Sequence, residues 1–419
     1  MTKCSRIPQK TFPDSTLRLL MEGYMFIPNR CKKYKSDLFV TRIMGKKVVC
    51  MTGSDAAEIF YNNQLMTRKG ALPKRIQKTL FGKNAIQTMD GISHRHRKRL
   101  FLSIMEIDKI EDLNRIMKKL WKSYAKTWSH NDTLILFDEA AAILCHGACI
   151  WSGIPIKKTD VKALAKDLTA MVDAFGAVGP RYYKGRLARI RTECKMKDII
   201  TKVRQQKIIV PYDSALFRIA FYRDPYGRLL DAKLAAIELI NILRPITAIA
   251  TYITFGALAL YKYPRCKEKL VKGKLNYSHM FAQEIRRYFP FAPFLGAKVK
   301  NDFLYSKHYF KKGSLVFLDI YGSNHDRRIW EKPYRFNPSR FSFRDGNPYD
   351  FIPQGGGDLE KGHRCPGEWL TIMLLKTAME FMAKNLSYNV PLQDLSYSLR
   401  RIPAIPKSRF IFNQIKYIP

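Results

Sequence analysis

The stretch from Gly355 to Trp369 constrains the fold most, because it joins a run of glycines to one cysteine and to the start of a helix. The glycines at 355–357 let the backbone approach a flat ligand closely. Pro366 suits the first position of a helix, where its missing N–H costs nothing. Apolar residues then repeat at helical spacing, at Trp369, Ile372, Met373, Leu375, Met379 and Met382. We therefore expect Cys365 at a helix start, where free amides and the helix dipole favour a thiolate.

A lone Cys-Pro-Gly is most often an ordinary buried cysteine beside a turn, but the residues around Cys365 are more specific. The segment His363-Arg364-Cys365-Pro366-Gly367, after a glycine-rich loop, resembles the haem-binding loop of cytochromes P450, whose iron takes a cysteine thiolate. In most of that superfamily a Phe lies seven positions before the cysteine, whereas Phe351 lies fourteen before it. This longer loop resembles the fatty-acid peroxygenase branch. The resemblance implies haem b with Cys365 as the metal ligand.

The net charge is extreme, because 74 Lys and Arg face 35 Asp and Glu, which leaves +39. Such a surface is expected to attract polyanions. The basic residues form many separate clusters rather than one arm, which favours anionic membranes or anionic substrates over nucleic acid. The clusters are 32–35, 94–99, 118–126, 181–197 and 267–274. The reason for so large an excess is not evident from the sequence.

The eight cysteines lack the spacing of a disulfide framework, and no signal peptide opens the chain, so we expect a cytoplasmic protein. Cys145 and Cys149 flank His146 and could suggest a metal site. Since no second pair of ligands follows, core packing is the expected role.

No repeat or linker divides the chain, so residues 1–419 are expected to form one domain. Helical periodicity dominates from Asp108 to Tyr261, whereas strand-like runs occur near 37–51 and 299–357. The expected fold class is mainly α with small β-sheets. The resemblance implies the cytochrome P450 fold, with haem between a long central helix and the cysteine loop.

The most hydrophobic segment, Leu234 to Tyr261, is long enough to span a membrane. Glu238, Asn241 and Arg244-Pro245 argue against this, because charges near the middle of a span are costly. We expect the long central helix of a soluble enzyme, kinked near Pro245.

Glu284 and Arg287 have the spacing of a surface ion pair, which usually means little. Followed by Arg340 and then Cys365, they resemble the Glu-x-x-Arg pair of cytochromes P450 with its third partner. This implies that they stabilise the haem-side core.

His94 and Lys98 lie one helical turn apart and could belong to a solvated basic face. The resemblance implies instead that they, with Arg68, bind the haem propionates. Buried carboxylates need cationic or N–H partners, so this assignment is physically reasonable.

The central helix lacks the proton-delivery pair of ordinary cytochrome P450 monooxygenases, an acid directly before a threonine. Thr247, Thr251 and Thr254 follow apolar residues, and Arg244-Pro245 stands in the helix instead. Arg244 could form an internal salt bridge with Glu238. The functional interpretation is that Arg244 binds a fatty-acid carboxylate, which then acts as the general acid-base in cleavage of hydrogen peroxide. Arg244 and Pro245 are thus predicted catalytic residues.

The sequence is similar to bacterial peroxygenases that hydroxylate long-chain fatty acids at the α or β carbon, with hydrogen peroxide as co-substrate. No dedicated redox partner is then expected. The residues that match the fatty-acid channel of that family are Phe81, Val172, Phe175, Phe291 and Phe294. Each could equally be plain core.

Gln87, the third predicted catalytic residue, occupies the position of a histidine in relatives that decarboxylate fatty acids to terminal alkenes. Glutamine cannot supply a proton as imidazolium does, so hydroxylation is favoured and decarboxylation is the alternative. A packing role for Gln87 stays open. A reductase-dependent monooxygenase is the other alternative, and the missing acid-threonine pair argues against it.

Overall fold

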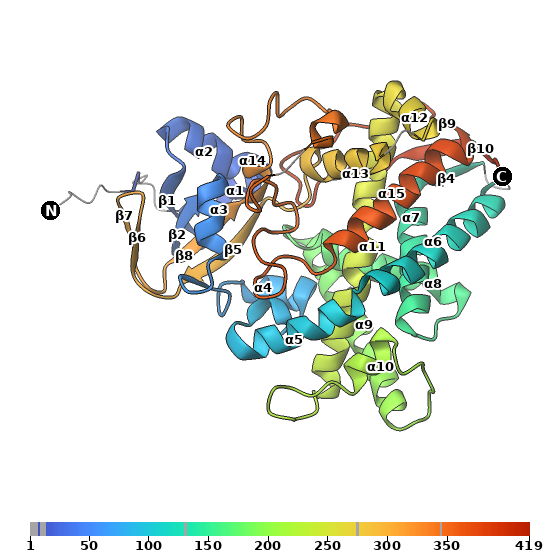
Figure 1. Cartoon of the computed structure of the whole chain (residues 1–419), viewed down its shortest axis with the longest axis horizontal. Coiled ribbons are helices and arrows are strands. Elements are labelled where there is room, and N and C mark those ends of the chain that lie inside the picture. Colours follow the sequence, from blue (N-terminus) through green and yellow to red (C-terminus); the bar gives the residue numbers. More distant parts are fainter. Residues whose placement is uncertain (1–6, 9–13, 130–131, 274–275, 344–345) are drawn as a thin grey trace.

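The structure is a computed structural model that describes residues 7–8, 14–129, 132–273, 276–343 and 346–419. Cys4 lies outside these ranges. Helices make up most of the molecule, and the strands gather mainly on the side where the chain begins (Figure 1). This confirms the predicted fold class, mainly α with small β-sheets.

The helices begin and end as follows. They are α1 (Thr16–Glu22), α2 (Phe26–Tyr34), α3 (Ser54–Tyr61), α4 (Lys74–Ile76), α5 (Gly91–Ile104), α6 (Ile107–Trp128), α7 (Leu136–Ser152), α8 (Val161–Asp173), α9 (Pro180–Arg204), α10 (Ala215–Ala220), α11 (Ala232–Lys262), α12 (Pro264–Val271), α13 (Tyr277–Tyr288), α14 (Ile320–Ser323) and α15 (Glu368–Lys384). A short helical turn, Gln77–Phe81, follows α4, and another, Ile86–Thr88, precedes α5.

The larger sheet has five strands in the order β1-β2-β8-β5-β3. Their bounds are β1 (Leu38–Ile43), β2 (Lys46–Met51), β8 (Leu315–Asp319), β5 (Phe294–Val299) and β3 (Met66–Thr67). Strands β2 and β8 are parallel, with Val48 opposite Leu315, and the other pairs are antiparallel. The sheet therefore joins the first part of the chain to the segment that precedes the cysteine loop.

Two smaller sheets complete the strands. The first has the order β4-β10-β9, from β4 (Thr133–Ile135), β10 (Ile411–Tyr417) and β9 (Leu386–Asn389). The second is the hairpin of β6 (Phe303–Tyr305) and β7 (His308–Phe310).

Helix α11 runs through the core and contacts α7, α8, α9 and α15. It starts two residues earlier than predicted because the Asp231 carboxylate caps it, accepting hydrogen bonds from the N–H groups of Lys233 and Leu234. It continues through Pro245, whose kink stays a prediction. In the most apolar stretch of α11, 89% is buried inside the protein. Helix α11 is therefore a core helix and not a membrane span.

Cys145 and Cys149 are both buried in the main core on α7, in agreement with the predicted packing role. No group of three or more His, Cys, Asp or Glu side chains suited to a metal ion occurs in the described part of the chain.

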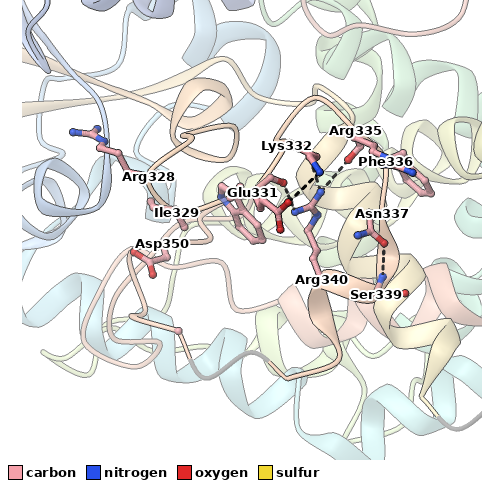
Figure 2. A pocket seen from close by; sticks show the side chains of 12 residues that line it. Arg328, Ile329, Glu331, Lys332, Arg335, Phe336, Asn337, Ser339, Arg340 and Asp350 are labelled. Carbon is pink, nitrogen blue, oxygen red and sulfur yellow. Dashed lines mark hydrogen bonds and ion pairs between the residues drawn. The ribbon is translucent and has the colours of Figure 1, made fainter.

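Glu284 on α13 is a buried carboxylate that two arginines share. Arg287 Nε lies 2.7 Å from its Oε2, and Arg340 Nε lies 3.2 Å from the same oxygen. The Asn337 N–H donates to its Oε1 at 2.8 Å. The Arg340 guanidinium also donates to the carbonyl groups of Glu331 and Arg335, beside a surface pocket of about 890 Å³ (Figure 2). Glu284 thus connects the segment that carries Asn337 and Arg340 to α13.

We predict that Glu284→Ala lowers the free energy of unfolding by about 3–5 kcal/mol, because it leaves two guanidinium groups buried without a counter-charge. Denaturant or thermal unfolding measures the change. Glu331→Ala is the matched control, since Glu331 pairs with Lys332 on the exposed surface and such pairs contribute little. Equal effects of the two substitutions would contradict the structural role of Glu284.

Candidate active site

Cys365 lies just before α15, at the end of the glycine-rich loop. Its N–H donates to the Gln354 carbonyl at 2.9 Å, and its Sγ lies 3.7 Å from Gln354 Nε2. The Gln354 Oε1 accepts a hydrogen bond from Arg286 at 3.0 Å, which leaves its N–H₂ to face the sulfur. Helix α15 begins at Glu368, so Pro366 belongs to the turn before it. The prediction that Pro366 occupies the first helical position is therefore wrong. The Pro366-Gly367 turn separates the sulfur from the helix.

Cys365 is half-buried, and desolvation of its thiol raises the pKa above the ordinary value. A hydrogen bond from the Gly367 N–H and the charge of Lys98 act in the opposite direction and only partly compensate. The helix start alone therefore does not favour the thiolate, contrary to the expectation from the sequence. A metal cation on the sulfur reverses this balance, because a coordinated thiol is deprotonated outright.

His94 and Lys98 contact the segment just before Cys365, and the backbone N–H of Arg68 donates to Asp90, which is hydrogen-bonded to His363. His94 and Lys98 lie on α5 and are buried, so they do not form a solvated basic face. The His94 ring stacks 4.1 Å from the His363 ring, and Lys98 Nζ contacts the carbonyl groups of Gly362 and Arg364. Burial lowers the pKa of His94 to about 3 and that of Lys98 to about 8.

Within the described residues, neither Arg68 nor Lys98 forms an ion pair with a carboxylate. Arg68 lies over the Phe60 ring at 4.2 Å and donates to the Phe60 carbonyl at 3.3 Å. Asp90 instead pairs with His363, at 3.1 Å between Oδ1 and Nε2. Buried cations without a counter-charge are costly, so this cluster suits a ligand that brings carboxylates. The donor set fits a haem with its propionates here and its iron at Cys365.

Arg244 is a third buried cation that forms no ion pair with a carboxylate in the described part of the chain. Its side chain lies within α11, and the residue is 6% exposed. Its Nη2 donates to Asn241 Oδ1 at 3.1 Å, whereas its Nε is buried without a hydrogen-bond partner. Burial and the nearby charge of Arg189 lower its pKa to about 9. A negative charge on Cys365 acts in the opposite direction and only partly offsets this lowering of the Arg244 pKa.

Glu238 does not neutralise Arg244, which removes the internal salt bridge considered from the sequence. Glu238 Oε1 lies 2.9 Å from Arg97 Nη1 and accepts the Ile86 N–H at 3.0 Å. Its Oε2 accepts from Asn241 Nδ2 at 3.0 Å. The Glu238 carboxylate therefore pairs with Arg97, on α5. Arg244 has no carboxylate partner in the described part of the chain.

Asn241 orients the guanidinium of Arg244. The Asn241 Nδ2 donates both to Glu238 and to the Phe81 carbonyl, each at 3.0 Å, so its oxygen must face Arg244. Glu238, Asn241 and Arg244 follow one another at a spacing of three on one face of α11. Sequence reasoning missed Asn241, although this spacing to Arg244 was a usable signal.

A small apolar cluster begins one helical turn after Arg244, at Ala248. Leu80 and Val172 form its buried part with Ala248, and partly buried side chains pack around them: Ile76, Phe81, Phe175 and Phe291. Four of the five predicted channel residues thus come together, and Ile76, Leu80 and Ala248 are additional members. The Phe81 ring also lies 5.3 Å from the Arg244 guanidinium carbon.

Phe294, the fifth predicted channel residue, lies in a different cluster. It opens strand β5 and stacks on Phe317 at 4.7 Å, beside Phe26 and Phe39. Strand pairing between β5 and β8 fixes the direction of its side chain, and the sequence did not reveal this. Gln87 lies in the turn held by Glu238, and its Oε1 is buried without a hydrogen-bond partner.

Comparison with solved structures shows close relatives of the whole chain. Cytochrome P450EX alpha, CYP152N1, superposes with a TM-score of 0.95 at 38% identity, and the match covers 99% of this chain and 100% of the other. Ligand-free cytochrome P450 OleT superposes with a TM-score of 0.96 at 36% identity, over 99% of each chain. A variant of cytochrome P450SP alpha, CYP152B1, superposes with a TM-score of 0.95 at 39% identity, over 97% of this chain and 100% of the other.

More distant relatives agree. A family model for cytochrome P450 matches residues 260–410. Cytochrome P450 716A75 of Maesa lanceolata is 22% identical over 91% of this chain and 83% of its own length. Human cytochrome P450 3A5 is 27% identical over 39% of this chain and 36% of its own length.

The fold and the cysteine loop define a haem-thiolate oxidoreductase. More than a third of the residues are identical to those of the solved relatives over nearly the whole chain. The chain belongs to the cytochrome P450 superfamily, in its CYP152 branch.

We predict that Cys365→Ser removes the thiolate-haem absorption band of the reduced, carbon monoxide-bound protein, since serine does not supply a thiolate. The exposed Cys194 provides the matched control, and Cys194→Ser should leave the band unchanged. A retained band in Cys365→Ser would assign the ligand to another cysteine.

Proposed function

We propose that this protein uses hydrogen peroxide to hydroxylate long-chain fatty acids at the α or β carbon. The observation that carries the proposal is Arg244, a buried guanidinium with an unpaired Nε and no carboxylate partner among the described residues. A carboxylate ligand would supply the missing charge and acceptors. In support, cytochrome P450EX alpha was solved with myristic acid and a variant of cytochrome P450 OleT with arachidonic acid.

The protein would hold haem b through Cys365, with Arg68, His94 and Lys98 around the propionates. When bound, the haem supplies the iron centre at which peroxide is activated and the C–H bond is oxidised. Gln354 faces Cys365 with its N–H₂ group and thereby orients and stabilises the negative sulfur.

Arg244 would bind the fatty-acid carboxylate with paired, charge-assisted hydrogen bonds. The carboxylate can then accept a proton from one peroxide oxygen and return it to the other, which replaces the acid-threonine pair of ordinary relatives. Pro245 follows Arg244 and has no N–H to donate to the Asn241 carbonyl. The apolar cluster around Ala248 would receive the first part of the alkyl chain and exclude water. Anchoring the carboxylate places the α and β carbons nearest the oxidant.

Decarboxylation to a terminal alkene is the second candidate for the same site. It requires a different fate of the oxidised substrate and would be favoured by an imidazolium near the carboxylate. Gln87 cannot provide that proton, and its buried Oε1 is only an acceptor. Hydroxylation is therefore the favoured outcome.

The direct experiment mixes the purified haem-loaded protein with a long-chain saturated fatty acid and hydrogen peroxide, without a reductase. We expect acids hydroxylated at the α or β carbon, identified by mass spectrometry. Dominant terminal alkenes would retain the Arg244 argument and refute the Gln87 argument. Activity only with a reductase and a nicotinamide cofactor would refute the proposed role of Arg244.

In the same assay, we expect Arg244→Leu to lose peroxide-driven turnover of long-chain acids while it keeps its haem. Arg191→Leu is the matched control, because Arg191 pairs with Asp167 on the surface of α9. Unchanged turnover in Arg244→Leu would show that the carboxylate is held elsewhere.

We also predict that Asn241→Ala raises the KM for the fatty acid by about tenfold, because a hydrogen bond to a charged group is typically worth that much. The haem absorbance should stay normal. A normal absorbance would show that the variant is folded and that the higher KM comes from a changed orientation of the Arg244 guanidinium. An unchanged KM would mean that the packing of α11 alone orients Arg244.

A further inference from the structure

Helix α9 carries an exposed apolar row that no other described segment covers. Tyr183 is 65% exposed, Leu187 55% and Ile190 43%, although large apolar side chains are usually buried. Their spacing of four and three places them on one face of the helix, and the exposed Cys194 continues that face. Scattered apolar residues are normal on a surface, but a continuous row at helical spacing indicates an interaction site.

Basic side chains lie on both sides of this apolar row. Lys184, Arg191 and Lys195 flank one edge, and Arg186 and Lys197 flank the other, as the helical positions require. Arg191 and Lys195 pair with Asp167 and Asp160, whereas Lys184 and Lys197 are exposed and form no ion pair within the described residues. The row ends at the exposed Asp198, which pairs with Lys202. The face before it is amphipathic, with Lys184 and Lys197 as its charges outside ion pairs among the described residues.

We infer that this face of α9 docks on an anionic lipid bilayer. Apolar side chains can enter the boundary between headgroups and acyl chains while the flanking lysines contact anionic headgroups. A second copy of this chain fits poorly, because each copy brings a net charge of +39. A nucleic acid would match the charge but would leave the apolar row exposed to water.

The docking face lies directly behind the wall of the apolar cluster near Arg244. Arg189, on the inner side of α9, donates to the Leu80 carbonyl at 3.0 Å, and Arg186 donates to the Lys78 carbonyl at 3.2 Å. Helix α9 also packs along α8, which carries Val172. A bilayer on the outer side of α9 would thus lie next to the elements that line the site. The docking itself does not depend on the reaction that the site performs.

The test is flotation of the purified haem-loaded protein with vesicles of phosphatidylcholine, alone or mixed with phosphatidylglycerol. We expect binding only to the mixed vesicles and weaker binding at higher ionic strength, because salt screens the attraction. Leu187→Glu should lower the vesicle partition coefficient by about tenfold, since it removes buried apolar area and adds a repelled charge.

Leu304→Glu is the matched control. It introduces the same charge at another exposed leucine, on β6, which lies far from α9 (Figure 1). Retained binding in this variant, with loss in Leu187→Glu, supports the assignment to α9. Equal binding by both variants would overturn it and attribute any adsorption to net charge alone. Binding to duplex DNA that Leu187→Glu weakens to the same extent would also overturn it, in favour of a nucleic-acid face.

Discussion

The site is organised around the buried positive charge of the Arg244 guanidinium. None of the described residues neutralises this charge. Four charged or polar side chains lie in one line, Arg97, Glu238, Asn241 and Arg244, yet they contain two cations and one anion. Burying a charge is tolerated only when partners compensate for it. Glu238 neutralises Arg97, although Arg97 Nε stays buried without a hydrogen-bond partner, and Arg244 has no carboxylate among the described residues.

The same line of residues connects the parts of the site that lie far apart in the sequence. Glu238 holds the turn that carries Gln87 through the Ile86 N–H, and Asn241 holds the Phe81 carbonyl. Both N–H donors of Asn241 are used and its oxygen accepts from Arg244, so a shift of Asn241 would disturb the Phe81 segment together with the Arg244 guanidinium. Asn241 therefore links the position of the Arg244 guanidinium to the shape of the apolar wall.

The sequence predicted the residues whose chemistry is tied to a local pattern. The loop singled out Cys365, the spacing singled out Glu284 and Arg287, and the missing acid-threonine pair singled out Arg244. The structure confirms the pair of Glu284 with Arg287, whereas the roles of Cys365 and Arg244 stay predictions. What the sequence could not provide were partners fixed by tertiary packing. The pairing of Glu238 with Arg97 joins α11 to α5, and the position of Phe294 follows from the pairing of β5 with β8. The pKa of Cys365 was misjudged for the same reason, because burial outweighs the local helix start.

The charge of the chain has two distinct consequences that follow from burial. Inside the protein, cations such as Arg68, Lys98 and Arg244 are few, fixed and short of counter-charges, so each can select a particular anionic group. At the surface, lysines such as Lys184 and Lys197 are hydrated and exposed, so they attract anionic surfaces without selecting a particular ligand. The apolar row on α9 adds the selectivity that surface charge lacks, because only an interface with both charge and an apolar layer satisfies it. In the proposed scheme the excess of +39 would supply general attraction, whereas the buried cations and the apolar row would determine where each anion is held.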